Sequence, residues 1–124
     1  MAATPMLGRL RTLGLGPIGV EKLPVVIEIG AAYTKCGFAG ESAPRHIIPS
    51  VVQRKGQAIR VYDPVQATEE KELKSILIDF FFDVFYKHLL VKAIERRILL
   101  VENPFAPTSF RQAVADVLFG HYKV

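Results

Sequence analysis

The sequence contains no tryptophan, a single cysteine and no long uninterrupted apolar run. With Cys36 alone, an intramolecular disulfide and a zinc site built from several cysteines are both excluded. The most apolar stretch, from Ile76 to Phe82, is broken by Asp79 and is too short to span a bilayer. These absences exclude a disulfide-stapled secreted module and predict no membrane insertion.

A strong charge of one sign is also absent. The net charge is +4 over 124 residues, and the lysines and arginines are scattered along the chain. Nucleic-acid binding usually needs a denser basic face interleaved with aromatic side chains, so we expect no nucleic-acid partner. Hydrophobic residues make up 50% of the sequence, which predicts a globular domain rather than a disordered chain.

The first 23 residues lack serine and have no acidic residue before Glu21. Arg9 and Arg11 without nearby acids are typical of a mitochondrial or chloroplast transit peptide, but the missing serines and the repeated Gly and Pro oppose that interpretation. We therefore predict a flexible leader over residues 1–23 and a folded unit over residues 24–124. A targeting segment remains the alternative for the leader.

Three short apolar segments open the folded unit. β-Branched and aromatic residues with intervening turn residues predict strands at 25–29, 33–39 and 46–52. Pro49 places the third of these strands at a sheet edge or a bulge. Residues 58–62 are a candidate for one more short strand. Tight turns between the first three strands predict an antiparallel meander.

A helix is predicted after Asp63 and Pro64, which have the pattern of an N-cap followed by proline at the first helical position. The side chains expected on its apolar face are Leu73, Ile76, Leu77, Phe80, Phe81, Val84, Phe85 and His88. Residues 97–101 then form a nearly continuous apolar run, which predicts a parallel strand covered on both faces.

A last helix is predicted over residues 110–119. Ser109 and Gln112 have the spacing of a capping box at its start, and Gly120 suits its end. The predicted order is β-β-β-α-β-α, which is an α/β fold with a mixed sheet. A further strand at the parallel edge is expected after the last helix, so the sequence predicts a truncated unit.

The turn between the first two strands carries residues that suit a phosphate group. Glu28 ends an apolar strand, where a buried acid needs a cation, water or N–H donors. Gly30, Ala31 and Ala32 form a small-residue turn whose N–H groups can face an anion, and Lys35 follows on the return strand. A plain ion pair between Glu28 and Lys35 across the hairpin is the alternative.

Three motifs resemble the actin superfamily. Residues 28–45, EIGAAYTKCGFAGESAPR, resemble its first phosphate loop and the Gly-Phe-Ala-Gly-Asp and Ala-Pro-Arg that follow. Residues 48–52, IPSVV, are similar to its Phe-Pro-Ser-Ile-Val, and residues 99–104, LLVENP, to its Leu-Thr-Glu-Ala-Pro. The resemblance implies the N-terminal subdomain of an actin-like ATPase domain, with a ribonuclease H-like fold that is incomplete in this chain.

Within that superfamily, residues 33–41 and 85–91 resemble the actin-related proteins at the pointed end of dynactin more than actin itself. This implies a cytoplasmic, cytoskeletal, non-catalytic structural subunit that supports dynein-driven transport along microtubules. The implied partners are other dynactin subunits, at the pointed end of the actin-like filament and in the pointed-end complex. Two alternatives are an actin-like ATP-binding protein completed only in a longer product, and an unrelated small basic binding module.

The resemblance also implies a weakened nucleotide site. Glu28 replaces the family's metal-organising Asp, Ala31 replaces the loop Ser, and Ala32 replaces the second loop Gly, while Gly30 and Lys35 remain. Ala32 would restrict a backbone that needs a positive φ. In the family, the second phosphate loop and the adenosine pocket lie beyond the last residue of this sequence. We therefore expect no catalytic residue, no metal site and no tightly bound cofactor, with ATP and Mg²⁺ only in a full-length form.

The remaining reactive side chains are predicted to be structural. Cys36 is expected to be a small buried hydrophobe, with Lys35 as a neighbour that can lower the pKa of its thiol. His88 is expected in the core or at its boundary rather than as a ligand. His46 and His121 have no partner at a metal-ligand spacing.

Overall fold

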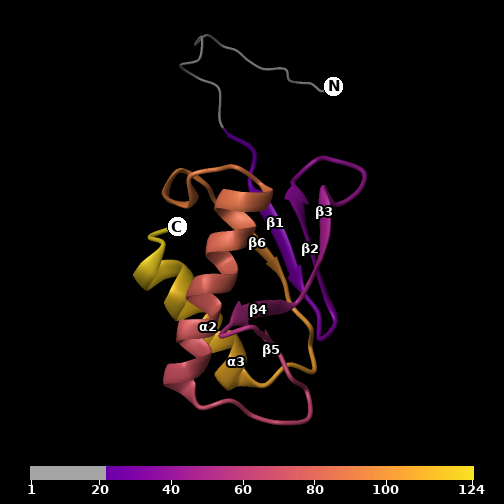
Figure 1. Cartoon of the computed structure of the whole chain (residues 1–124). Helices are drawn as coiled ribbons and strands as arrows, with labels where there is room; N and C mark the ends of the chain where they lie inside the picture. Colours follow the sequence, from indigo (N-terminus) through magenta and orange to yellow (C-terminus); the bar gives the residue numbers. More distant parts are fainter. Residues whose placement is uncertain (1–21) are drawn as a thin grey trace, which may run out of the picture.

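Two helices pack against one side of a four-stranded sheet (Figure 1). The computed structural model of the chain describes residues 22–124. The leader predicted over residues 1–23 lies outside this range except for its last two residues, and it stays a prediction. Within residues 22–124, no helix combines the length and the apolar character needed to cross a bilayer.

The four-stranded sheet has the order β3-β2-β1-β6. Strand β1 (Val25–Ile29) pairs antiparallel with β2 (Tyr33–Phe38), and β2 pairs antiparallel with β3 (His46–Pro49). Strand β6 (Ile98–Val101) lies on the other side of β1 and pairs with it in parallel. This arrangement confirms the predicted mixed sheet and its antiparallel meander.

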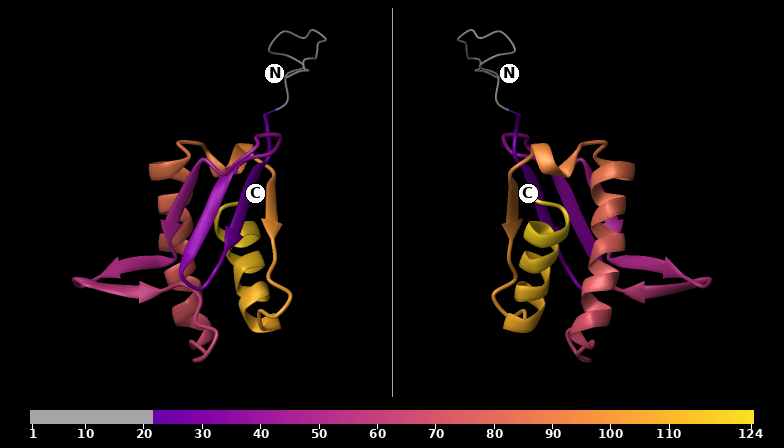
Figure 2. Two further views of the ribbon diagram at one scale, coloured as in Figure 1. Left: turned by 90° about the vertical axis from the view of Figure 1, so that its right-hand side faces the viewer. Right: turned by 90° about the vertical axis from the view of Figure 1, so that its left-hand side faces the viewer.

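The single strand predicted over 46–52 is wrong, because the chain leaves the sheet at Ser50. Strand β3 ends at Pro49, whose ring nitrogen has no hydrogen to donate to a ladder. Ser50 is fully buried, and its hydroxyl is 2.7 Å from the Thr34 hydroxyl. Strand β4 (Val51–Arg54) then pairs with β5 (Gln57–Arg60) in a separate hairpin that projects from the domain (Figure 2).

The predicted N-cap at Asp63 does not start a helix. Its Oδ1 accepts hydrogen bonds from the N–H groups of Val65 (2.9 Å) and Gln66 (3.2 Å), which close a local turn and lower the pKa of Asp63. Helix α2 (Glu70–Phe82) begins seven residues after Asp63, with no side-chain cap. The Asp63 carboxylate is satisfied by the N–H groups of its own turn and is therefore not available to cap a helix.

Helix α3 (Thr108–Asp116) also starts without the predicted capping box. The structure gives no side-chain hydrogen bond at its N-terminus, so Ser109 does not act as a cap. The amide of Gln112 instead donates to the Asp116 carboxylate one turn later, at 2.8 Å. The Gln112 side chain therefore makes an i,i+4 contact on the helix surface instead of the capping contact expected at the start of the helix.

Both helices end in the same way. Each widens into a π-helical segment, η2 (Asp83–His88) after α2 and η4 (Val117–His121) after α3. A residue with left-handed backbone follows two positions later: Leu90 with φ of 56° and Lys123 with φ of 60°. Gly120, predicted to end the last helix, lies inside η4 instead.

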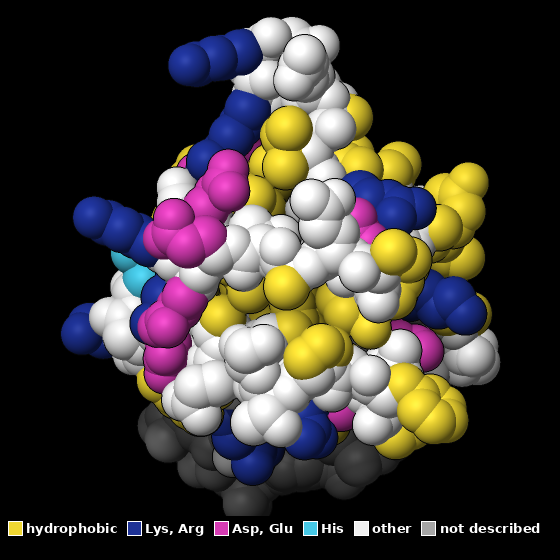
Figure 3. Space-filling view, turned by 90° about the horizontal axis from the view of Figure 1, so that it is seen from below, with side chains coloured by type: hydrophobic (Ala, Val, Ile, Leu, Met, Phe, Trp, Pro, Cys, Tyr) yellow, Lys and Arg dark blue, Asp and Glu magenta, His cyan; other side chains and the backbone are white. Residues whose placement is uncertain are grey.

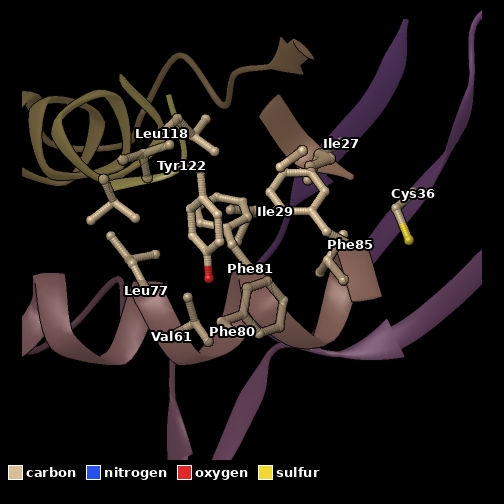
Figure 4. Packing of buried hydrophobic residues seen from close by; sticks show 14 of the residues in the cluster. Ile27, Ile29, Cys36, Val61, Leu77, Phe80, Phe81, Phe85, Leu118 and Tyr122 are labelled. Carbon is tan, nitrogen blue, oxygen red and sulfur yellow. The ribbon is translucent and has the colours of Figure 1, made fainter. Parts of the chain in front are cut away.

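The hydrophobic core lies between the helices and the sheet (Figure 4). The predicted stripe on α2 and η2 is confirmed for seven of its eight residues, all buried: Leu73, Ile76, Leu77, Phe80, Phe81, Val84 and Phe85. The eighth, His88, is half-buried at the core boundary, as the structural interpretation expected. Tyr122 packs its ring against Phe81 and Phe85, and its hydroxyl donates to the Ile78 carbonyl of α2. Burial raises the pKa of Tyr122 to about 12.

The two faces of the four-stranded sheet differ. Side chains alternate along each strand, so Val25, Ile27 and Ile29 of β1 face the helices and are buried. We call this side the covered face, and the opposite side the open face. The expectation that β6 is covered on both faces is wrong within residues 22–124. Leu99 of β6 lies on the open face and is 53% exposed, and Val101 on the same face is 47% exposed.

Candidate functional site

The phosphate-loop resemblance falls on the hairpin formed by β1 and β2. Glu28 lies directly opposite Lys35 in the antiparallel register, and both side chains are exposed on the open face. The expected burial of Glu28 is therefore wrong, because the alternation of β1 points it away from the core. Within residues 22–124, Glu28 and Lys35 do not form the ion pair that was the alternative interpretation.

The turn itself is held by backbone contacts. The N–H of Gly30 donates to the Tyr33 carbonyl at 2.9 Å, and a Cβ on Gly30 would lie 2.8 Å from that oxygen, so the turn requires glycine there. The Ala32 carbonyl accepts a hydrogen bond from the N–H of Ser50 at 2.9 Å. Ala32 has no positive φ, so the backbone restriction expected for it does not arise.

The turn offers two hydrogen-bond donors. Across the described range, the backbone N–H groups of Ala31 and Ala32 have no acceptor. Neighbouring free N–H groups in a turn are the usual way a backbone binds an anion. Ala31 brings no hydroxyl to support them. The turn therefore offers two backbone donors and no hydroxyl donor at position 31.

Glu28 and Lys35 do not join the turn in one pocket. They line a hollow of about 380 Å³ on the open face, whose rim is the loop from Ala39 to Pro44. Gly30, Ala31 and Ala32 do not line that hollow. Figure 3 views the end of the molecule at which the β1–β2 turn lies, and the lysine and arginine side chains there are spread around the margin. The predicted site is thus divided into a pair of charges and a separate turn.

The most specific part of the resemblance, residues 37–45, has a structural explanation. A Cβ on Gly37 would lie 2.9 Å from the Arg45 nitrogen, so only glycine lets the returning loop approach strand β2. Gly40 has φ of 88°, a conformation that L side chains rarely adopt. Both glycines are therefore needed for the shape of the loop.

Charged and aromatic groups close the same loop. The Arg45 guanidinium binds the Glu41 carboxylate through two nitrogens, with Nη2 to Oε2 at 2.7 Å and Nε to Oε1 at 3.0 Å. The Phe38 ring lies under two guanidinium groups, Arg45 at 5.0 Å and Arg96 at 5.2 Å from its centroid. This stack connects the loop to the segment before β6.

Cys36 is 1% exposed, which confirms the prediction of a small buried hydrophobe. Burial raises the pKa of its thiol to about 11. The expected lowering by Lys35 is wrong, since neighbouring residues on a strand point to opposite faces and Lys35 lies on the open one.

One pair was missed by reasoning from the sequence. The rings of His46 on β3 and His88 on η2 lie 5.4 Å apart between centroids. Forty-two positions separate them, and no local spacing signals the contact. No cluster of three or more metal-ligating side chains occurs among the residues that the structure describes.

Comparison with known proteins identifies the family of this chain. The sequence profile of the family described as Actin matches residues 19–124, and the chain belongs to the actin family. A curated relative, "Actin-related protein 10" of Dictyostelium discoideum, is 34% identical over 128 residues, which cover 84% of this chain. The chain spans about a quarter of that relative, 27% of its length. The resemblance predicted from the motifs is confirmed, and the mixed sheet with its helices is an actin-like α/β fold.

Proposed function

We propose that this chain acts as, or as part of, a non-catalytic structural subunit in the pointed-end complex of dynactin. The observation that carries the proposal is its similarity to an actin-related protein rather than to actin alone, spread over 84% of the chain. The resemblance of residues 33–41 and 85–91 to the actin-related proteins at the pointed end of dynactin supports the same assignment. Its partners would be the pointed end of the actin-like filament and neighbouring subunits, in the cytoplasm, where dynactin supports dynein-driven transport.

The geometry of the hairpin supports a structural rather than a catalytic role. Phosphoryl transfer depends on groups that are positioned together around the phosphates and the metal. Here Lys35 and Glu28 line one hollow, and the free N–H groups of Ala31 and Ala32 lie outside it. No residue of the described chain is assigned a catalytic role.

ATP with Mg²⁺, which the family implies, fits these residues only in part. The two N–H groups of the turn suit a phosphate oxygen, but Ala31 lacks the hydroxyl and Lys35 faces a different hollow. We therefore derive no reaction step through a nucleotide. Our expectation remains that nucleotide binding, if it occurs, belongs to a full-length form.

Affinity capture tests the proposal. The chain is expressed with a tag in cells that contain dynactin, and the captured proteins are identified by mass spectrometry. We expect dynactin subunits to be enriched over a tagged unrelated protein. We expect the same enrichment with Lys35→Ala, because assembly should not require the degraded phosphate loop. Capture of no dynactin subunit, in this chain and in its longest transcript product, would overturn the proposal.

A further inference from the structure

A hollow of about 390 Å³ is lined by segments that lie at the end of the molecule opposite the β1–β2 turn, as the ribbon in Figure 1 places them. Three segments meet there: residues 22–24, the loop 39–45 and residues 89–97. Its volume lies toward the lower end of the range for ligand pockets. We name it the Leu90 surface, defined by the residues Lys22, Leu23, Arg45, Leu90 and Arg96.

Leu90 is unusual in both conformation and exposure. Its φ of 56° is left-handed, a region in which a branched side chain is strained. Its neighbours Leu89 and Val91 are buried, and their N–H groups bind the carbonyls of Val84 and Phe85 at 2.9 Å, which fixes the helix end. Leu90 itself is 78% exposed, so its side chain gains little from the folded chain.

The second helix end shows what such a position normally accepts. Lys123 has the same left-handed backbone, with φ of 60°, and the N–H groups on either side of it bind back to η4 in the same way. Its polar side chain suits solvent. Glycine is the favoured residue at such a position, and a polar residue is the usual substitute. An exposed leucine has no such advantage here, which makes Leu90 a candidate for an apolar contact with another molecule.

The charges around Leu90 indicate the chemistry of that contact. Glu41 neutralises Arg45, and Glu95 forms an ion pair with Lys22. Arg96 donates to the Leu23 carbonyl at 2.7 Å and has no carboxylate partner within residues 22–124. Lys22, Arg45 and Arg96 thus face only two carboxylates, so this surface carries an excess of positive charge.

Lys92 adds a further cation close by, because Lys22, Lys92 and Arg96 all lower the pKa of the single Glu95 carboxyl, which leaves positive charge in excess. Opposite charge on the partner would favour and orient the encounter. The only charged side chains among residues 1–20 are those of Arg9 and Arg11, which do not complement a positive surface. A second copy of the chain is also disfavoured by its net charge of +4. A partner protein with acidic side chains therefore complements this surface best.

We propose that the Leu90 surface binds an acidic segment of a partner protein that carries one apolar side chain. The apolar side chain packs on Leu90 and Leu23, and the partner's carboxylates face Arg96 and Lys92. This site is independent of the phosphate loop and of the dynactin assignment.

The test uses the full chain and a short fluorescein-labelled peptide of glutamates around one leucine, measured by fluorescence anisotropy. Leu90→Gly removes the apolar side chain and also relieves the backbone strain. We expect this variant to bind the peptide about tenfold more weakly, or worse, because a buried leucine contact is lost. We also expect its melting temperature to be no lower than that of the unchanged chain, so that lost binding cannot be attributed to unfolding.

Three controls complete the experiment. Lys123→Gly makes the same backbone change at the other helix end and should leave peptide binding unchanged. A peptide with serine in place of its leucine should bind about tenfold more weakly. Vesicles of phosphatidylcholine and phosphatidylserine should not bind. Equal binding by Leu90→Gly, equal binding of the serine peptide, or binding of vesicles without peptide would each overturn the proposal.

Discussion

The covered and open faces of the four-stranded sheet are made by the same strands and have opposite properties. On the covered face, every side chain of β1 is buried against the helices, and the aromatic rings of α2 and η2 fill the space behind them. On the open face, Glu28 and Lys35 stand among half-exposed apolar side chains. The covered face therefore stabilises the fold. Glu28 and Lys35, which belong to the segment that resembles a phosphate loop, lie on a face that contributes little to stability.

The largest expected effect comes from the covered face. Phe81 is fully buried and contacts the rings of Phe80, Phe85 and Tyr122. We expect Phe81→Ala to lower the free energy of unfolding by about 3–5 kcal/mol, from lost burial and the cavity left behind. Urea unfolding followed by circular dichroism measures this. A loss below about 1 kcal/mol would show that the covered face is not the main source of stability.

A smaller effect is expected at the buried hydroxyl pair. Ser50→Ala leaves the Thr34 hydroxyl buried without a partner, so we expect a loss of about 1–3 kcal/mol. Adding Thr34→Val removes the orphaned group and should recover part of that loss. A double variant less stable than Ser50→Ala would contradict this account of why the chain leaves the sheet at Ser50.

Alkaline pH probes the covered face without a mutation. The thiol of Cys36 ionises near pH 9 when exposed, and burial raises its pKa to about 11 in the folded chain. The folded pKa is the higher one, so this contribution to stability is complete below pH 9 and is lost as the pH rises toward 11. Unfolding midpoints measured across that window should fall, and Cys36→Ala should flatten the fall. An unchanged slope in the variant would place the effect elsewhere, for example at Tyr122.

The smallest effect is expected on the open face. Tyr33 is 60% exposed, and its ring faces away from the helices. We expect Tyr33→Ala to change the free energy of unfolding by no more than about 0.5 kcal/mol, as for most surface substitutions. The same urea titration serves as the measurement. A loss close to that of Phe81→Ala would mean that the two faces are energetically alike.

The sequence predicted those features that depend on local periodicity. The helical stripe from Leu73 to Phe85 and the meander of the first three strands follow from spacing alone. The exposure of Glu28 also follows from the sequence, because the alternation of Val25, Ile27 and Ile29 places it on the opposite face of the strand.

Other features depend on contacts between distant segments. The break at Ser50 requires the Thr34 hydroxyl, sixteen positions away, and the approach of His46 to His88 requires the finished packing of β3 against η2. The cap predicted at Asp63 failed because its carboxylate found nearer N–H groups. Local sequence patterns do not show which of several possible partners a side chain will contact, since tertiary packing decides between them.

The central claim is that this member of the actin family serves assembly and that its hairpin is a degraded phosphate site. Calorimetric titration of the chain with Mg-ATP tests this most directly, with Lys35→Ala as the matched variant. The account predicts weak, unsaturated heats that are the same for both proteins. Tight, saturable binding that Lys35→Ala abolishes would contradict it.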